Sequence, residues 1–349
     1  MVAMRDAFIP PHTLPTVNRQ MALVQRPAGT PRASDFECLR GAVPTCGEGG
    51  FLVRNLYLSA DPAQRGWAAD TALTPFGAPM RALAVGIVVD SRDETVVPGD
   101  IVYGRFGWQD YAVAGHDDLF SQIRDPQTPI SLYAGVLGMP GITAWLALRQ
   151  LASPCADDLL LVTTAAGAVG SVVGQLARMS GARVVGLTGS DEKAARCVAR
   201  YGYHQALNYR TGNLAQDLEN VAPEGFTIFF DNAGGTIADI ALRTMRRHGR
   251  IIQCGTAATP AWKPIPTGPR NEREILMRAL SWTGFIIFDH RARFPGALEA
   301  LTAMVLAGQL THDEEIVSGM DQIATAFEGM MTGRNRGKIL AFIGEDRTG

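Results

Sequence analysis

The spacing of hydrophobic positions along the chain changes near residue 125. Before that point the apolar runs are short and separated by turn residues, as at 51–58, 83–89 and 100–104. The four residues from Val97 to Asp100 include proline and glycine and are typical of a tight turn between two strands. Short strands joined by turns predict an all-β region, either a small barrel or a sandwich.

From residue 159 onward, strand-like apolar runs alternate with amphipathic segments of helical period. This alternation predicts right-handed β-α-β units and therefore a parallel sheet. The predicted strands are residues 159–164, 183–187, 205–208, 227–230, 250–254 and 281–288. The predicted helices are residues 142–151, 169–180, 191–201, 213–221 and 295–307.

The end of the chain returns to strand character at residues 314–317 and 338–343, with a predicted helix at 320–331 between them. We expect this tail to rejoin the first region. The predicted fold class is therefore α/β with two domains, as suits a chain of 349 residues. A β-rich domain covers residues 1–125 and is completed by 311–349, and a doubly wound parallel-sheet domain covers 126–310.

The strongest chemical signal follows the predicted strand at 159–164. The residues from Ala165 to Gly170 form a small-residue turn that matches G-x-G-x-x-G with alanine at its first position. Gly167 would let the backbone approach a pyrophosphate, and Gly170 would let the next helix pack closely on the strand. The helix N-terminus supplies N–H groups and partial positive charge. In this order of strand, turn and helix, a dinucleotide site is favoured over a mere packing contact between glycines.

The residues after the second predicted strand indicate which nicotinamide cofactor is used. A site that prefers NAD usually carries an acidic side chain about 20 residues on, at the end of that strand. Here Gly189 and Ser190 follow the strand, and Asp191 and Glu192 stand as first-turn helix residues behind a serine cap. Lys193 would reach a 2′-phosphate from the same turn, although a solvated helix lysine is the alternative. The pattern favours NADPH over NADH.

Composition and charge exclude several classes of protein. The chain is 46% hydrophobic, which is ample for a core, and its 32 basic and 34 acidic side chains give a net charge of -2. This balance provides no long-range attraction to nucleic acid or to an anionic membrane. No apolar run approaches the roughly 20 residues that cross a bilayer. Arg5 and Asp6 argue against a signal peptide, and five dispersed cysteines form no disulfide framework. A cytoplasmic protein is expected.

The sequence also argues against a bound metal. A catalytic zinc needs three protein ligands and an open position. No Gly-His-Glu run and no cysteine cluster occurs, and His116 and Asp117 are adjacent, so their side chains point apart. We therefore predict chemistry without a metal.

Seven sequence blocks, in order from one end of the chain to the other, are similar to one known family. The blocks are residues 54–62, 137–144, 165–175, 189–193, 230–235, 284–290 and 333–338. They resemble the medium-chain dehydrogenase/reductase superfamily. Within it they are similar to the zinc-independent branch of leukotriene B4 dehydrogenase/prostaglandin reductases, plant alkenal double-bond reductases and bacterial curcumin-reductase-like enzymes.

This resemblance implies a GroES-like first domain, a Rossmann second domain, and a cleft between them that holds NADP(H). Alignment of the motifs implies three groups of cofactor-binding residues. The pyrophosphate group is Gly167, Ala168, Val169 and Gly170, and the 2′-phosphate group is Lys193 and Tyr209. Ser190 is a further cofactor-binding candidate. The nicotinamide group is Asn232, Cys254, Gly255, Thr256, Phe285, Ile286, Ile287 and Asn335. Met139 stands where zinc-dependent relatives place a cysteine ligand, or it is an ordinary core methionine.

Two departures from the family pattern fall in segments that the resemblance assigns to the substrate pocket. Relatives have a tyrosine shortly after the Cys254–Gly255 turn, where this chain has Pro260 and its neighbours. The family's Asp-Pro-Tyr-Met-Arg becomes Asp-Pro-Ala-Gln-Arg, with Ala63 in place of the tyrosine. The implied use of the cofactor survives these changes, whereas the identity of the substrate does not carry over.

The resemblance implies reduction of a carbon–carbon double bond conjugated to a ketone or aldehyde, with hydride transfer to the β-carbon of the small-molecule substrate. No catalytic residue is assigned, and the pocket candidates are Tyr57, Trp108, Tyr111 and Met139, the aromatic ones being core residues in the alternative interpretation. The rival functions are an NADPH quinone oxidoreductase, a zinc alcohol dehydrogenase and a non-catalytic NADPH- or RNA-binding protein. Arg243, Arg246 and Arg247 would form a basic patch, or more simply a solvated helix face.

The predicted strand from Ser281 to Phe288 also bears on assembly. It would be the edge strand of the nucleotide-binding domain, and its apolar sequence would favour aggregation if it were left uncovered. Pairing with the same strand of a second copy, as in relatives, would cover it, so we expect a homodimer.

Overall fold

The computed structural model describes residues 14–123, 126–259, 261–262 and 264–344. They fall into two compact units. The first unit contains the residues up to Gly138 together with those from Glu314 onward, and the second runs from Met139 to Asp313. The first unit thus continues past residue 125, because η2 (Ile130–Ala134) packs on strands of its sheet.

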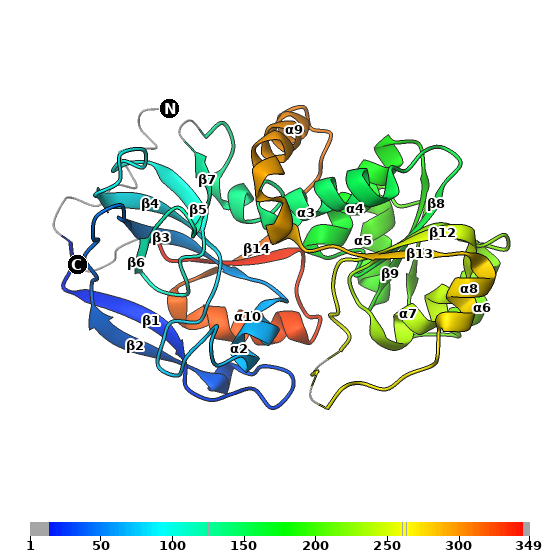
Figure 1. The fold of residues 1–349 in the computed structure, drawn as a ribbon, viewed down its shortest axis with the longest axis horizontal. Helices are drawn as coiled ribbons and strands as arrows, with labels where there is room; N and C mark the ends of the chain where they lie inside the picture. The colour runs from blue at the N-terminus through cyan, green and yellow to red at the C-terminus, as the bar shows by residue number, and fades with distance from the viewer. Residues whose placement is uncertain (1–13, 124–125, 260, 263, 345–349) are drawn as a thin grey trace. The chain divides into compact units, whose positions relative to one another are not determined.

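The first unit is built mainly from antiparallel strands (Figure 1). β1 (Val17–Leu23) and β2 (Phe36–Ala42) form a separate pair. The main sheet has the order β14 (Glu314–Ser318), β15 (Lys338–Phe342), β3 (Phe51–Ala60), β4 (Ala84–Ser91), β5 (Ile101–Gly104) and β7 (Leu119–Ile123), with β6 (Tyr111–Ala114) also on β3. β14 and β15 are parallel to each other, and β15 pairs antiparallel with β3. The tail of the chain therefore completes the sheet that its first part begins.

Short helical elements accompany this sheet. They are η1 (Ala33–Asp35), α2 (Gln64–Ala69), η5 (Met320–Gln322) and α10 (Ile323–Met331). The tight turn predicted before β5 is confirmed, because the Asp100 N–H donates to the Val97 carbonyl oxygen at 3.0 Å. Gly99 within it has φ of +93°, which favours glycine.

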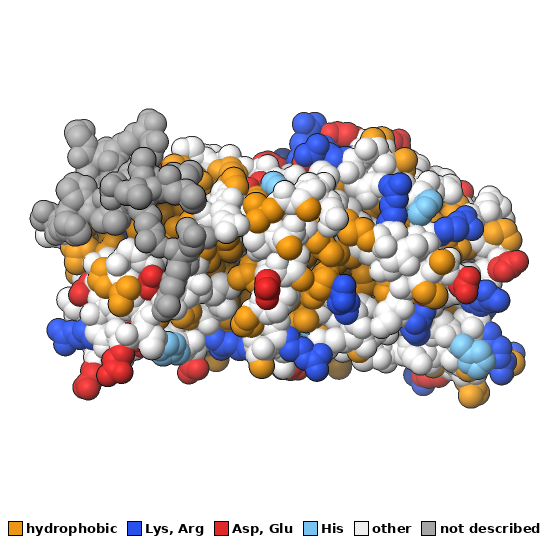
Figure 2. Space-filling model, turned by 90° about the horizontal axis from the view of Figure 1, so that it is seen from above, with side chains coloured by type: hydrophobic (Ala, Val, Ile, Leu, Met, Phe, Trp, Pro, Cys, Tyr) orange, Lys and Arg blue, Asp and Glu red, His pale blue; other side chains and the backbone are white. Residues whose placement is uncertain are grey.

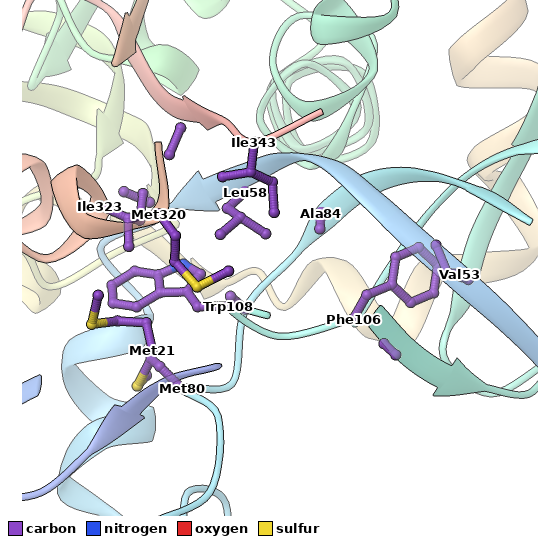
Figure 3. Close-up of a cluster of buried hydrophobic side chains, with 14 of the residues drawn as sticks. Met21, Val53, Leu58, Met80, Ala84, Phe106, Trp108, Met320, Ile323 and Ile343 are labelled. Atoms are coloured by element: carbon purple, nitrogen blue, oxygen red, sulfur yellow. The ribbon is translucent and has the colours of Figure 1, made fainter. Parts of the chain in front are cut away.

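One face of the main sheet packs on a hydrophobic core that surrounds a buried tryptophan. Figure 3 shows the Trp108 indole among Met21, Met80 and Met320. Alternate residues of β15, such as Ile339, belong to this core, and the residues between them face the other side of the sheet. Every second residue of β15 thus lies in the core, as expected for a strand with one face buried.

The second unit is a six-stranded sheet whose paired strands are all parallel. Its order is β10 (Gln205–Asn208), β9 (Arg183–Thr188), β8 (Leu159–Thr163), β11 (Phe226–Asp231), β12 (Met245–Gln253) and β13 (Ser281–Gly284). Relative to sequence order this is 3-2-1-4-5-6, the order of a doubly wound Rossmann sheet. The predicted parallel sheet is confirmed, and the order reverses between β8 and β11.

Helices cover both faces of this sheet (Figure 1). They are α3 (Met139–Ala147), η3 (Leu148–Ala152), α4 (Ala168–Met179), α5 (Asp191–Tyr201), α6 (Leu214–Val221), α7 (Gly235–Leu242), α8 (Glu272–Arg278), η4 (Ile287–Arg293) and α9 (Phe294–Leu306). Buried residues of α6 and α7 share a core with β8, β9, β11 and β12. α4 packs on β8 and β9 and contacts α3 and α5.

Two strand predictions at this edge of the sheet need correction. The strand predicted from Ser281 to Phe288 ends at Gly284, after which the chain turns into η4. β12 begins at Met245 rather than at residue 250, and a left-handed His248 with φ of +64° interrupts its register with β11. A polar, arginine-rich start therefore belongs to a strand that the apolar pattern alone does not reveal.

The helix face predicted for Arg243, Arg246 and Arg247 is also wrong. α7 ends at Leu242, and Arg246 and Arg247 lie at the start of β12. All three side chains are exposed, as expected of a solvated surface.

Candidate cofactor site

The loop between β8 and α4 has the geometry of an anion-binding turn. Gly167 is the N-cap of α4 and has no side chain to cap it, so the first N–H groups of the helix are left for a ligand. The Gly167 N–H donates to the Thr164 carbonyl oxygen at 2.8 Å and closes the turn. Thr164 has φ of +49°, a left-handed conformation that is strained in a residue with a β-branched side chain.

Two glycines of this loop are required by close backbone contacts. A β-carbon on Gly170 would lie 2.4 Å from the Thr164 carbonyl oxygen, and one on Gly167 would lie 3.0 Å from the same atom. The structure therefore agrees with the tight strand-to-helix packing expected at Gly170. Ala168 and Val169 lie in the first turn of α4 and are partly exposed. All four predicted pyrophosphate residues are brought together at the point where the strand order reverses.

At the end of β9, the serine cap is present as predicted. Ser190 is the N-cap of α5, and its hydroxyl accepts a hydrogen bond from the Lys193 N–H at 3.3 Å. The Asp191 carboxylate accepts a hydrogen bond from the Asn208 side-chain amide at 2.9 Å and is exposed. Glu192 forms an ion pair with Arg196 at 3.1 Å. Both acidic side chains of this turn are thus engaged in local contacts.

Tyr209 lies beside this turn, together with an arginine that the sequence analysis did not assign. A β-carbon on Gly189 would lie 3.0 Å from the Tyr209 hydroxyl and 3.4 Å from Arg210 Nε. The Arg210 guanidinium lies 5.8 Å from the centre of the Tyr209 ring. The Tyr209 N–H donates to the Thr188 carbonyl oxygen at 3.0 Å, which fixes this segment against β9. The position of Arg210 directly after Tyr209 is the signal that would have found it.

The turns after β11 and β12 are held together by backbone hydrogen bonds. The N–H groups of Cys254 and Gly255 donate to the Asp231 carbonyl oxygen at 2.8 and 3.1 Å. The Asn232 side-chain amide donates to the Thr163 carbonyl oxygen at 3.0 Å. Asn232, Cys254, Gly255 and the following Thr256 therefore lie together, at the carboxyl ends of the central strands.

Cys254 has a thiol that resists ionisation. Burial and the nearby charge of Asp231 raise the pKa of the Cys254 thiol to about 12. At neutral pH the side chain therefore stays protonated, and it acts as a small apolar group rather than as a nucleophile.

Three predicted nicotinamide residues follow β13. The Phe285 N–H donates to the Gln253 carbonyl oxygen at 3.0 Å, so the pairing with β12 extends one residue past the strand. The Phe285 ring is buried and stacks on His290, with ring centres 4.8 Å apart. Ile286 is exposed, and Ile287 begins η4. Asn335 belongs to the first unit, where its side-chain amide donates to the Gly337 carbonyl oxygen at 2.9 Å.

Comparison with known proteins places these features in a family. Residues 19–121 match the family model of the N-terminal domain of oxidoreductase, and residues 168–303 match that of zinc-binding dehydrogenase. The putative NADP-dependent oxidoreductase YfmJ of Bacillus subtilis is 35% identical over 329 residues, which are 92% of this chain and 96% of that protein. This chain belongs to the medium-chain dehydrogenase/reductase superfamily.

Two further relatives place the chain within the superfamily. The NADP(+)-dependent 2-alkenal reductase of Nicotiana tabacum is 32% identical over 340 residues, 94% of this chain and 98% of the relative. The crystal structure of CurA from Vibrio vulnificus in complex with NADPH superimposes with a TM-score of 0.85 and 32% identity over 93% of this chain and 98% of that chain. The chain lies in the zinc-independent branch that the sequence resemblance predicted.

In this member of the superfamily, the four pocket candidates differ in exposure. Trp108 is fully buried, and its indole N–H donates to the Ser59 carbonyl oxygen at 2.9 Å. Tyr111 is buried beneath the Arg54 guanidinium, which lies 5.0 Å from its ring centre. Met139 is buried at the start of α3. These three positions agree with the core interpretation of their side chains.

Tyr57 is the partly exposed member of the four. Its ring centre lies 5.0 Å from that of Phe342 on β15. Burial and the nearby charge of Glu314 raise the pKa of the Tyr57 phenol. Burial likewise raises the pKa of Glu314, although a hydrogen bond from Ser131 at 2.8 Å opposes the shift. Tyr57 therefore keeps its proton at neutral pH and is able to donate it in a hydrogen bond.

Sequence reasoning missed a buried ion pair at the end of β3. The Lys338 ammonium group donates to the Ser59 hydroxyl at 2.6 Å, to the Ala60 carbonyl oxygen at 2.7 Å and to Asp61 at 2.6 Å. All three of its hydrogens are thus used. The Ser59 hydroxyl also donates to Asp61. The Lys338 side chain therefore links the sequence blocks at 54–62 and 333–338, and it holds β15 to the end of β3.

Neither a candidate metal cluster nor a membrane-spanning helix occurs among the described residues. In the parts of the chain that the structure describes, His, Cys, Asp and Glu side chains form no group of three or more that could hold a metal ion. None of the described helices is long and apolar enough to cross a bilayer. Pro260 and the start of the chain lie outside the described residues.

Proposed function

We propose that this chain is an NADPH-dependent reductase of carbon–carbon double bonds conjugated to a ketone or aldehyde. The observation that carries the cofactor assignment is the uncapped start of α4 at the strand-order reversal, where backbone N–H groups are available to a pyrophosphate. The substrate class is supported by the relatives, which include alkenal, curcumin and pulegone reductases.

The choice of NADPH over NADH is supported at the end of β9. Asp191 Oδ1 accepts a hydrogen bond from the Asn208 side-chain amide, so one of its two carboxylate oxygens is already engaged. Lys193 and Arg210 supply positive charge near the Gly189 turn, and Tyr209 adds a hydroxyl donor. Cationic and hydroxyl groups in this place suit a 2′-phosphate, whereas a carboxylate would repel it.

The protein's part in the reaction is to hold and orient the reactants. NADPH, when bound, supplies a hydride to the electrophilic β-carbon. The turns at Asn232 and at Cys254–Thr256 would surround the nicotinamide half and fix the direction of approach. In the first unit, Tyr57 stays a candidate hydrogen-bond donor, because its raised pKa keeps the hydroxyl protonated.

We also propose that the reaction needs no metal. An enone already spreads incoming charge onto its own oxygen, so a hydrogen-bond donor suffices to stabilise the enolate. Dialysis against a chelator should leave the rate unchanged, and a loss restored by zinc would contradict the proposal.

The test is a panel of acceptors measured with each cofactor. Enals, enones and a benzoquinone are assayed by NADPH oxidation, and the same panel is repeated with NADH. We expect the saturated carbonyl as product, formed faster with NADPH. Turnover of the quinone alone would support a quinone reductase, and binding of NADPH without turnover of any acceptor would support a non-catalytic protein.

The face that Figure 2 shows gives no special support to RNA binding. On the face that Figure 2 shows, small groups of basic side chains alternate with acidic and hydrophobic ones. Binding of single-stranded RNA needs a basic groove with aromatic platforms. A gel-shift assay in the same panel serves as the direct check.

We further propose that the chain forms a homodimer through β13. This strand is the last of its sheet, and its four residues are exposed. Trp282 is 40% exposed and Ile286 is 61% exposed, so apolar surface accompanies the open edge. A second copy would add its own β13 to this edge.

Sedimentation measures this proposal directly. We expect the mass of a dimer at micromolar concentration and a monomer for Gly284→Pro. This change removes an N–H from the open edge, because the N–H of the next residue, Phe285, points the other way and donates to β12. The control is Val198→Lys on α5, an exposed apolar position of the same unit. A monomeric wild-type protein would contradict the proposal.

A cytoplasmic location stays a prediction, supported by five cysteines that are all free.

A further inference from the structure

Asp231, at the end of β11, is a fully buried carboxylate held by neutral groups. Its Oδ1 accepts hydrogen bonds from the Thr163 hydroxyl at 2.7 Å and the Ala233 N–H at 2.8 Å. Its Oδ2 accepts from the Gly234 N–H at 3.0 Å and from the Gln253 side-chain amide at 2.8 Å. Among the described residues no basic side chain forms an ion pair with it. A buried charge of this kind depends on every one of its donors.

Gln253 uses all of its polar atoms to join neighbouring strands to this carboxylate. Its amide nitrogen donates to Asp231 Oδ2 and, at 2.7 Å, to the Gly255 carbonyl oxygen. Its amide oxygen accepts a hydrogen bond from the Trp282 indole N–H at 3.2 Å. One side chain therefore contacts β11, the turn after β12, and the edge strand β13.

The same cluster also fixes the ends of β8 and β11 against each other. The Thr163 hydroxyl, which donates to Asp231, accepts a hydrogen bond from the Asn232 N–H at 2.7 Å. A β-carbon on Gly255 would lie 2.7 Å from the Asn232 carbonyl oxygen, so the turns after β11 and β12 touch. Any change in the place of Asp231 would shift both turns together.

We propose that Gln253, acting through Asp231, is a positioning residue for the nicotinamide half of the cofactor. The inference rests on the proposed function, in which the turns at Asn232 and at Cys254–Thr256 surround that half. Gln253 sets where these turns stand, and it has no part in holding the adenosine half. The adenosine end belongs to Lys193 and Tyr209 after β9 and β10, at the other side of the sheet.

The test separates the two halves of the cofactor. Gln253→Leu removes the donor to Asp231 and to the Gly255 carbonyl while keeping a side chain of similar size. We expect kcat/KM for NADPH to fall about tenfold, as for a lost hydrogen bond to a charged group. The dissociation constant of 2′,5′-ADP, which lacks the nicotinamide, should stay within about twofold of wild type.

A matched control and a conservative variant sharpen the result. Gln216→Leu makes the same change at an exposed site on α6, where the side-chain amide donates to Asn220 at 3.1 Å, and it should leave both values unchanged. Gln253→Glu puts a carboxyl beside Asp231, and this carboxyl donates a hydrogen bond only when it is protonated. The kcat/KM of that variant relative to wild type should therefore fall as the pH rises.

Three outcomes overturn the proposal. An unchanged kcat/KM in Gln253→Leu shows that the side chain positions nothing. An equal loss of 2′,5′-ADP binding shows a general effect on folding. A flat pH ratio for Gln253→Glu shows that the donor to Asp231 is irrelevant. If the wild-type protein itself bound no NADPH, the proposed function would fail first, and that result is distinct from all three.

Discussion

At the scale of single residues, the position of α4 on its sheet depends on one tyrosine and two glycines. A β-carbon on Gly174 would lie 2.1 Å from the Tyr203 ring, and one on Gly186 would lie 3.1 Å from it. The Tyr203 hydroxyl donates to the Gly170 carbonyl oxygen at 2.6 Å. Burial, with smaller contributions from Cys197 and Tyr201, raises the pKa of this phenol well above its usual value, so it stays a donor.

The sequence predicts the role of Gly170 but not the partner that secures it. A glycine fingerprint is local, so close packing of helix on strand follows from six adjacent residues. Tyr203 lies 33 residues farther along, and nothing in its neighbourhood indicates that its hydroxyl reaches this turn. Gln253 and Asp231 were missed for the same reason, since their hydrogen-bond partners come from other strands.

Tyr203→Phe should destabilise the protein while leaving its ring packing intact. The buried Gly170 carbonyl would lose a donor, which costs about 1–3 kcal/mol. Urea unfolding monitored by circular dichroism measures the change. Tyr201→Phe is the comparison: its hydroxyl donates to Asp313, which keeps Arg200 at 2.6 Å, so a smaller loss is expected. Equal stability of wild type and Tyr203→Phe would refute this account.

Lys193→Ala should weaken the use of NADPH and spare NADH. Loss of a charge-assisted contact to the 2′-phosphate would lower kcat/KM for NADPH by about 10- to 100-fold. Steady-state rates with both cofactors and one enone give the ratio. Arg196→Ala, one turn farther along α5 and paired with Glu192, is the control and should change neither value. A parallel fall with NADH would show that Lys193 does not recognise the phosphate.

At the scale of elements, the prediction succeeds where the signals that begin and end an element are local. The helix predicted at 191–201 matches α5 (Asp191–Tyr201), because Ser190 caps its start and a left-handed Gly202 with φ of +68° ends it. The end of β13 was mispredicted because the apolar sequence from Phe285 to Phe288 has strand character. There, the burial of Phe285 and its stacking on His290 take the chain out of the sheet.

Asp158 ties together three neighbouring strands of the second unit. Its carboxylate accepts hydrogen bonds from the Thr227 hydroxyl and from Arg250, each at 2.7 Å. Burial opposes ionisation, but these bonds and the Cys155 N–H outweigh it, so the pKa of Asp158 is lowered. Residues before β8, on β11 and on β12 therefore depend on one negative charge.

Asp158→Asn should lower stability at neutral pH, and the difference should vanish in acid. Because the folded pKa is depressed, the stabilisation is fully present above the unfolded value of about 4 and is lost as the pH falls through the folded value. Urea midpoints of both proteins between pH 7 and pH 3 test this. Asp157→Asn, at the exposed neighbour, is the control. A stability gap that persists at the lowest pH would contradict the assignment.

At the scale of the whole molecule, the chain forms two units, one with a mainly antiparallel sheet and one with a parallel sheet. The first closes on itself through its ends, because β15 pairs with β3 and Lys338 binds Asp61, 277 residues away. The second contains the strand-order reversal at which the dinucleotide loop stands. Strand alternation predicts both sheets from the sequence, whereas the ion pair between Lys338 and Asp61 within the first unit is visible only in the structure.

The most direct test of the function follows the hydride itself. Wild-type protein is given NADPH that carries deuterium at the transferable position of C4, together with an α,β-unsaturated ketone, and the product is examined by mass spectrometry and NMR. We predict a saturated ketone with one deuterium on its β-carbon. Deuterium on the carbonyl carbon of an allylic alcohol, or no transfer to any acceptor, would contradict the central claim.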